Sequence, residues 1–321
     1  MLFQTWISPN SRGSHRQRSM LASIVFRSGS SGGGTPNPRT AADLLHARLA
    51  TQLEALDREL VAVRAGHPEG VHQARIACRR LRSALATFRP LFDPDVTEPV
   101  REELRWLGQS LSDSRDRYVV GQRLLHQLAD EPLSFTVGPI ASRLRSTYLS
   151  PAEVPEALDS ERFTDLRVRL GLLVDDPPWT AKADRRAAKA ARKRVRADVA
   201  RVRDRYDVLD TAPDHDVAMH DLRKAAKRLR YAAETWEPVG GEDASCVVAA
   251  AKLLTSHLGD RQDTIVSRAH LVALAREADA AGEPTFTYGR LHAREQLRAD
   301  AMDAELPDLW ERFTAVVREL G

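Results

Sequence analysis

A thirteen-residue segment occurs twice in this chain, and this repeat constrains the fold more than any other feature. Residues 72–84 read HQARIACRRLRSA and residues 220–232 read HDLRKAAKRLRYA. Seven of the thirteen positions are identical at a constant offset of 148 residues. A weaker match at an offset of 147 relates LGQSLSDSRD (107–116) to LTSHLGDRQD (254–263). Self-similarity of this kind indicates a duplicated structural unit, so we expect a body made of two related halves.

The repeat sets the expected domain organisation. Residues 1–39 are rich in Ser, Gly and Arg and have the composition of a flexible tail, with Met20 as a possible alternative start. This composition also resembles that of a transit peptide, and we favour disorder or an overlong start over targeting. The body then covers residues 40–321, with a first half of about 40–176 and a second half of about 177–321.

The apolar residues of the body follow the period of a helix. Leucines at 45, 49, 53, 56 and 60 recur at steps of three and four, which is typical of an amphipathic helix. No segment alternates between apolar and polar residues as a strand does, and clusters such as Pro238–Gly241 and Gly282–Pro284 separate the helical segments. We therefore predict an all-α protein of long helices packed as bundles.

Each copy of the repeat predicts a helix with two distinct stripes about 120° apart. One stripe is basic and begins with histidine, and the other is apolar and suited to a bundle core. The basic stripes comprise His72, Arg75, Arg79 and Arg82 in the first copy and His220, Arg223, Lys227 and Arg230 in the second. The apolar stripes comprise Ala74, Cys78, Leu81, Leu85 and Phe88, and Leu222, Ala226, Leu229, Ala233 and Trp236. Arg80 and Arg228 lie on a third face.

Positive charge is concentrated on a few segments, although the chain as a whole is nearly neutral. Lys and Arg number 48 against 45 Asp and Glu, and residues 1–42 hold five arginines and no acid, so the remainder has a net charge of −2. Segments 71–82, 219–230 and 181–205 have net charges of +4, +4 and +8. In the last of these, four cations recur at helical steps: Arg185, Lys189, Arg192 and Arg196. Like charges on one helix destabilise it, so an anionic ligand is favoured over basic helices neutralised by acidic neighbours.

At these residues the sequence resembles the CHAD family, the conserved histidine α-helical domain. VHQARIACRRLRSAL and MHDLRKAAKRLRYAA are similar to the two histidine-led family motifs, and LSDSRD is similar to the segment that follows the first. The resemblance covers about residues 40–320. It implies two four-helix bundles related by pseudo-two-fold symmetry, with a basic central channel, and it implies binding of inorganic polyphosphate. The residues to which it assigns this role are His72, Arg75, Arg79, Arg80, Arg82, His220, Arg223, Lys227, Arg228 and Arg230, with Arg105 and Lys252 as weaker candidates.

The sequence departs from the family in three respects. Many members carry a CYTH domain with an ExExK signature, which this chain lacks, so triphosphatase activity is not implied. Ser112 stands where the family usually has Gly, and Gln262 stands in the second copy where the first has Arg115. The role of Arg115 is left open by this difference.

Other ligands and activities remain as alternatives. Nucleic acid is disfavoured because aromatic residues, on which bases would stack, make up only 6% of the chain. One histidine per half, next to arginine, is a poor metal site. A metal-dependent phosphohydrolase would have to use the repeated acids Asp113, Asp116, Asp260 and Asp263, which we expect instead to pair with the basic stripes. A scaffold that binds an acidic protein partner is a further alternative, and no feature of the sequence distinguishes it from the others.

The sequence therefore predicts a non-enzymatic polyphosphate-binding module without cofactor or metal. The candidate ligand residues are those of both repeat copies together with the four helically spaced cations of segment 181–205. Two cysteines without a CxxC motif, and no apolar run long enough to span a bilayer, favour a cytoplasmic protein. A role as a targeting or regulatory adaptor for polyphosphate granules would suit such a module.

Overall fold

A computed structural model describes residues 38–111, 113–149, 155–318 and 320, apart from the side chains of residues 68 and 113–116. Residues 1–37 of the predicted tail, including Met20, lie outside these residues, as do Ser112 and the side chains of Asp113, Arg115 and Asp116. The described chain is helical, and its only β pairings are two isolated bridges. The α-helices are α1 (Ala41–Arg64), α2 (Pro68–Thr87), α3 (Pro94–Ser110), α4 (Asp113–Ala129), α5 (Ile140–Tyr148), α6 (Glu161–Asp175), α7 (Ala187–Asp207), α8 (His215–Ala280) and α9 (Phe286–Arg318). Short 3-10 helices are η1 (Arg89–Leu91), η2 (Leu133–Phe135), η3 (Glu156–Asp159), η4 (Ala181–Asp184) and η5 (Leu209–Thr211).

Several helices begin where the sequence supplies a capping side chain. Thr40 accepts a hydrogen bond from the backbone of Asp43, and the Asp43 carboxylate accepts one from the backbone of Thr40, at 3.1 and 2.9 Å. Ser160 and Asp214 accept from the third residue beyond them in the same way, at the starts of α6 and α8. These bonds satisfy amide groups that have no partner within the helix.

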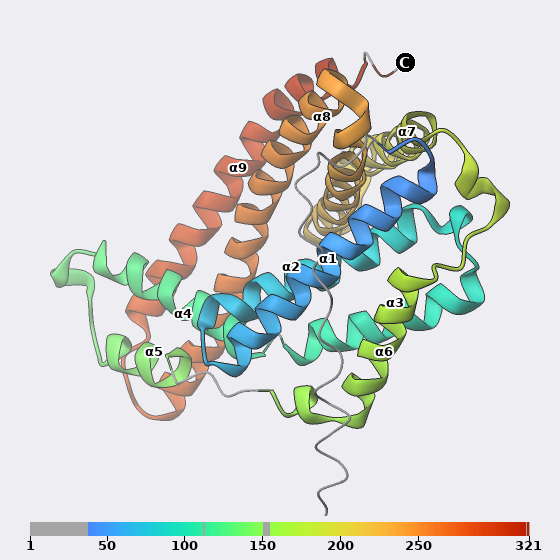
Figure 1. Cartoon of the computed structure of the whole chain (residues 1–321). Coiled ribbons are helices and arrows are strands. Elements are labelled where there is room, and N and C mark those ends of the chain that lie inside the picture. Colours follow the sequence, from blue (N-terminus) through green and yellow to red (C-terminus); the bar gives the residue numbers. More distant parts are fainter. Residues whose placement is uncertain (1–37, 112, 150–154, 319, 321) are drawn as a thin grey trace, which may run out of the picture. The chain divides into compact units, whose positions relative to one another are not determined.

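In the first half, α1 packs on α2 and α6, and α3 packs on the same two helices (Figure 1). The apolar stripe of α2 faces this core, because Ala74, Cys78, Leu81, Leu85 and Phe88 are all buried. The prediction made from the helical period is therefore confirmed for the first copy. The basic stripe lies about 120° away from this core-facing stripe and is held at its edge.

In the second half, α7 and α9 pack along α8. The apolar stripe Leu222, Ala226, Leu229, Ala233 and Trp236 is buried, as predicted. The Pro238–Gly241 cluster separates two helical segments, as predicted, because the range of α8 spans a kink at Gly241, whose backbone is not helical (φ +60°, ψ −146°). A residue with a side chain rarely adopts this backbone conformation, which explains why the kink lies at a glycine.

The two halves are joined by a reciprocal pair of backbone hydrogen bonds. The amide of Ala41 donates to the carbonyl of Arg185 at 2.8 Å, and the amide of Ala187 donates to the carbonyl of Arg39 at 2.9 Å. This is the hydrogen-bond pattern of the isolated antiparallel bridge between Thr40 and Arg186. Helices α1 and α7 begin directly after the two sides of this bridge, at Ala41 and Ala187.

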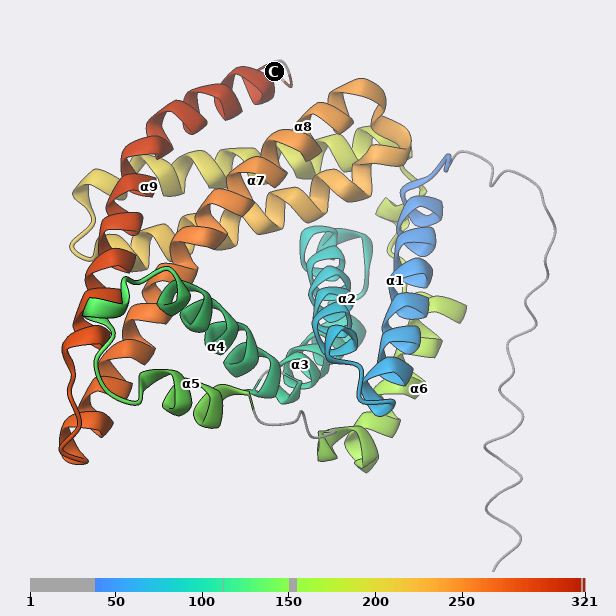
Figure 2. The ribbon, with the colours of Figure 1, turned by 90° about the vertical axis from the view of Figure 1, so that its left-hand side faces the viewer.

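A second apolar cluster was not foreseen from the sequence. It joins α4 and α5 to the last turns of α8 and the first turns of α9, through buried side chains such as Leu124, Leu144, Leu274 and Leu291 (Figure 2). These segments are far apart in the chain, so their periods predict four amphipathic helices but not their association. None of the described helices combines the length and apolar character needed to cross a membrane.

Candidate anion-binding site

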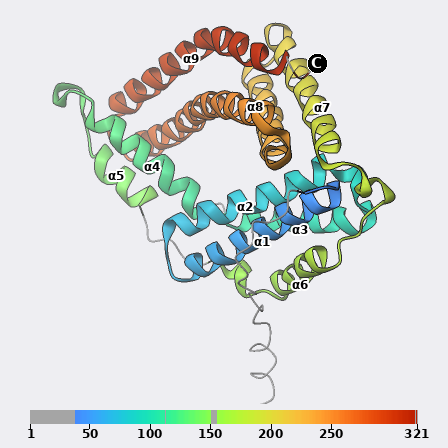
Figure 3. The same cartoon turned by 45° about the horizontal axis from the view of Figure 1, so that its top comes forward.

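The basic stripes of the two halves face one another. Helices α2 and α8 pack together (Figure 3), and this brings Arg79 of the first stripe close to Arg223 and Lys227 of the second. Burial and, to a smaller extent, the charges of Arg223 and Arg79 lower the pKa of Lys227 to about 7, although the charge of Asp263 acts in the opposite direction. Burial and the charge of Arg79 also lower the pKa of Arg223. Arg79, Arg223 and Lys227 of the two predicted stripes therefore form one strongly cationic region.

Some nitrogen atoms of this region have no hydrogen-bond acceptor in the described part of the chain. The Nε atoms of Arg82 and Arg223 are buried and without such a partner. A buried donor that lacks an acceptor is costly, and guanidinium groups are satisfied well by phosphate oxygens. These positions are consequently suited to an anionic ligand.

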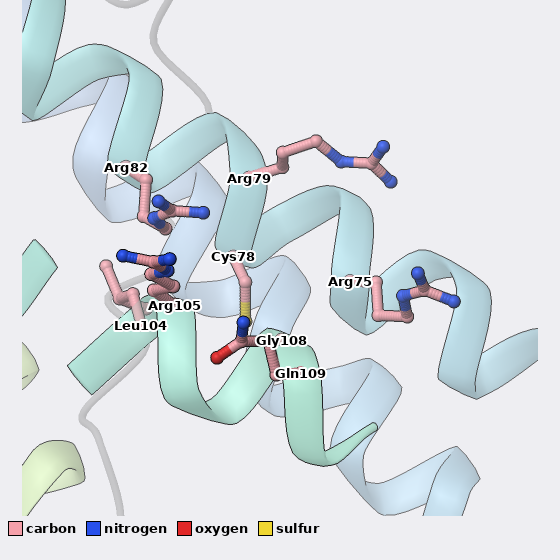
Figure 4. Close-up of a pocket in the computed structure, with 8 residues that line it drawn as sticks. All are labelled: Arg75, Cys78, Arg79, Arg82, Leu104, Arg105, Gly108 and Gln109. Atoms are coloured by element: carbon pink, nitrogen blue, oxygen red, sulfur yellow. The ribbon is translucent and has the colours of Figure 1, made fainter. Parts of the chain in front are cut away.

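The stripe of the first half also borders a cavity. Arg75, Arg79 and Arg82 of α2 and Arg105 of α3 line a space of about 250 Å³, in which Arg82 and Arg105 point toward one another (Figure 4). The structure thus brings Arg105, a weaker candidate, together with three residues of the repeat. Cys78 lies at the base of the cavity, and burial raises the pKa of its thiol to about 12, so it is poorly reactive.

Three of the predicted ligand arginines form ion pairs with carboxylates. The Nε atoms of Arg80 and Arg230 lie 3.2 and 3.0 Å from the two oxygens of Glu234, whose side chain is only 11% exposed. Arg228 Nε lies 2.9 Å from Asp198 Oδ1. These pairs tie α2, α7 and α8 together, so part of the charge of these three arginines is already balanced within the protein.

The remaining predicted ligand residues lie at several different positions in the fold. His220 Nδ1 donates to Gln262 Oε1 at 2.9 Å, which gives a role to the glutamine that stands in place of Arg115. His72 lies partly exposed on α2. Arg185 and Lys252 are exposed and line neither the cavity above nor the one on α7. The other three predicted cations of this segment line that separate cavity beside α7: Lys189, Arg192 and Arg196.

Of the repeated acids, Asp263 lies next to the cationic region. Its Oδ2 atom is 3.9 Å from Arg123 Nη1, and its charge acts on Arg223 and Lys227. This agrees with the interpretation that the acid pairs with the basic stripe. Within the described ranges, no group of three or more His, Cys, Asp or Glu side chains is placed to hold a metal ion.

Some carboxylates and arginines that contact the repeat arginines lie outside the repeat and were not predicted from the sequence. Arg48 of α1 lies 2.9 Å from Glu234, so this single carboxylate contacts arginines from three helices. Glu234 follows Arg230 by four residues, a spacing that allows a helical ion pair and could have drawn attention to it. Nothing in the sequence signals the contribution of Arg48.

Comparisons with known proteins agree with this architecture. The sequence matches the CHAD domain family over residues 47–272. It is 34% identical over 298 residues to two uncharacterized proteins from two strains of Mycobacterium tuberculosis, covering 89% of this chain and 56% of each relative. The chain thus spans about half the length of these curated relatives.

Two solved structures have a similar fold. One is the CHAD domain from the plant Ricinus communis, with 26% identity, a TM-score of 0.62, and coverage of 90% of this chain and 95% of that one. The other is PptA from Streptomyces chartreusis, with 24% identity, a TM-score of 0.66, and coverage of 85% and 100%. The second likeness concerns the fold alone.

Proposed function

Because this chain belongs to the CHAD domain family, we propose that it binds inorganic polyphosphate through its two facing basic stripes. The observation that carries this proposal is the position of Arg79, which lies against Arg223 and Lys227 from the other half of the repeat. Cations held together in this way repel one another, and a linear polyanion placed between them would relieve the repulsion. The ligand residues are Arg75, Arg79, Arg82, Arg105, Arg223 and Lys227.

The chemistry of these side chains suits phosphate. A guanidinium group offers a planar fork of donors that can engage two phosphate oxygens, whereas a lysine ammonium acts as a point charge. The buried Nε atoms of Arg82 and Arg223 need an acceptor, which a phosphate oxygen would supply. Release of counterions from the polyanion would add to the affinity and make it depend on salt.

We further infer that the two halves form two four-helix bundles related by pseudo-two-fold symmetry and that a basic channel lies between them. Support comes from the repeat of residues 72–84 at residues 220–232, and from the starts of α1 and α7 at Ala41 and Ala187, whose spacing of 146 residues is close to the repeat offset of 148. The apolar stripes of both copies are buried in equivalent ways, so the basic stripes project from equivalent places. Polyphosphate would then follow the channel and contact both halves.

We propose binding without hydrolysis. The acid nearest to the facing stripes, Asp263, lies against Arg123 and the stripe cations, a position that suits charge balance. The protein would act as a cytoplasmic adaptor that attaches to polyphosphate granules. The two cysteines support a reducing compartment, since neither Cys78 nor Cys246 is in a disulfide.

The test is a matched pair of charge reversals in the full chain. Arg79→Glu should weaken binding of long-chain polyphosphate by at least about tenfold, since it places an acid among the facing cations. Arg276→Glu on α8 changes the net charge equally, but Arg276 is exposed and has no ion pair in the described part of the chain, so we expect less than about a twofold effect. Equal affinities of the two folded variants would refute the assignment.

A further inference from the structure

Helix α7 carries a second group of cations beside a larger cavity. A space of about 730 Å³ lies between the first half of α7 and the kink of α8, and five cations line it. This volume falls within the range of about 300–1000 Å³ that is usual for sites of organic ligands, whereas the cavity beside α2 is smaller. The five cations are Arg186, Lys189, Arg192, Lys193 and Arg196.

These five side chains have no carboxylate partner among the described residues. Arg192 donates only to the backbone carbonyl of Leu320, at 3.3 Å, and its Nε atom is buried without an acceptor. On the same helix, Arg201 is paired with the buried Asp198, so α7 is able to provide a counterion where one is needed. A cluster of like charges without counterions is destabilising unless an anion binds there.

The repeat does not account for this cluster. Helices α1 and α7 begin at Ala41 and Ala187, so equivalent positions in the two helices are 146 residues apart. The equivalents in the first half of the five cavity cations are not basic, apart from one histidine: Thr40, Asp43, His46, Ala47 and Ala50. The cavity therefore belongs to the second half alone and is not a copy of the stripes that face one another between α2 and α8.

The opposite wall of the cavity has a different chemistry. Trp236, Val239 and Gly240 make it apolar, and Asp243 is the only acid among the described residues that line the cavity. An inorganic phosphate chain would gain nothing from this wall, whereas an organic phosphate could place its apolar part there. Only 2% of Trp236 is exposed, so the wall offers no aromatic face on which a base could stack.

We propose that this cavity binds an organic polyphosphate with an apolar part, for which a nucleoside triphosphate is the probe, independently of the facing stripes. The cations of α7 would hold the phosphate groups, and the sugar and base would lie against Val239 and Gly240. Because no ring is presented for stacking and Asp243 is the only acidic group, the site should accept different bases with similar affinity. The protein would then have two anion sites of different chemistry. One lies between α2 and α8, and the other lies between α7 and the kink of α8.

The experiment measures binding of a fluorescent methylanthraniloyl derivative of ATP to the full chain by anisotropy, with unlabelled ATP, GTP and tripolyphosphate as competitors. Arg196→Glu should weaken the binding of nucleotide by at least about tenfold. Arg194→Glu, two residues away on α7 and outside the cavity, should change it by less than about twofold. Val239→Ser should weaken ATP binding and leave tripolyphosphate binding unchanged.

Three results would overturn this proposal. Equal losses in Arg196→Glu and Arg194→Glu would show only a general attraction to positive charge. Tripolyphosphate competing as well as ATP would show that the apolar wall does not contribute. A loss of nucleotide binding in Arg79→Glu as large as in Arg196→Glu would place the nucleotide between the stripes. Wild-type protein that binds nucleotide but not polyphosphate would contradict the proposed function and leave this inference intact.

Discussion

At the scale of single residues, Lys227 is the most perturbed member of the facing stripes. Burial, together with the charges of Arg223 and Arg79, brings its pKa to about 7. The lysine is therefore about half protonated at neutral pH, although an exposed lysine would be fully charged. A bound polyanion would favour the charged form, so binding should be accompanied by proton uptake.

This coupling predicts that polyphosphate affinity falls as pH rises. Between pH 7 and 9, above the ordinary histidine pKa of about 6.5, the affinity should fall by up to about tenfold per pH unit as free Lys227 loses its proton. Lys227→Arg keeps its charge throughout this range and should abolish most of the dependence. Dissociation constants measured at pH 7, 8 and 9 provide the check, and an equally steep fall in both proteins would contradict the role of Lys227.

At the scale of helices, Glu234 connects three of them. Its carboxylate lies against Arg48 of α1, Arg80 of α2 and Arg230 of α8, in a setting where both Glu234 and Arg48 are largely buried. The contact joins the two halves of the repeat. The same carboxylate fixes the two arginines of the repeat motifs that it contacts.

We expect Glu234→Ala to lower the free energy of unfolding by about 3 kcal/mol, since it leaves buried guanidinium groups without a counterion. Asp221→Ala is the control, because its pair with Lys224 is exposed and should contribute less than about 1 kcal/mol. Urea denaturation of both variants measures the difference. A loss for Glu234→Ala no larger than that of the control would show that the carboxylate does not hold the helices together.

The kink in α8 gives a second prediction for an element. Gly241→Ala puts a side chain at φ +60°, ψ −146°, and this strain should cost about 1–3 kcal/mol of stability. Gly259→Ala lies in the regular part of the same helix, where an added Cβ meets no atom within 4 Å, and should be neutral or slightly stabilising. The midpoint temperature of thermal unfolding should therefore fall in Gly241→Ala and stay unchanged or rise slightly in Gly259→Ala. An equal shift in the two variants would argue against strain at Gly241.

The sequence predicted the helices better than their associations. The apolar stripes of α2 and α8 follow from helical spacing, and the structure buries both of them. Contacts between distant segments leave no such periodic signal, which is why the pairing of Arg48 with Glu234 and the cluster around Leu124 and Leu291 were missed. In the same way, the sequence assigned Lys189, Arg192 and Arg196 to the polyphosphate site, whereas packing places them beside a separate cavity.

At the scale of the whole molecule, the distribution of charge matters more than its sum. The net charge of +3 arises from the arginine-rich first 42 residues, and the rest is slightly acidic. Within the rest of the chain, the carboxylates of Glu234 and Asp198 balance the charge of some arginines of the repeat. Others, above all Arg79, Arg223 and Lys227, lie close to one another. Local accumulation of this kind attracts polyanions even when the net charge is small.

The central claim is that these facing stripes select polyphosphate among polyanions. The most direct measurement is competition of long-chain polyphosphate against single-stranded DNA and heparin, at matched charge and at several salt concentrations. We predict that polyphosphate binds more tightly than both at every salt concentration, while all affinities decrease with salt. Equal affinities for the three polyanions at matched charge would contradict the claim and leave only a general attraction to negative charge.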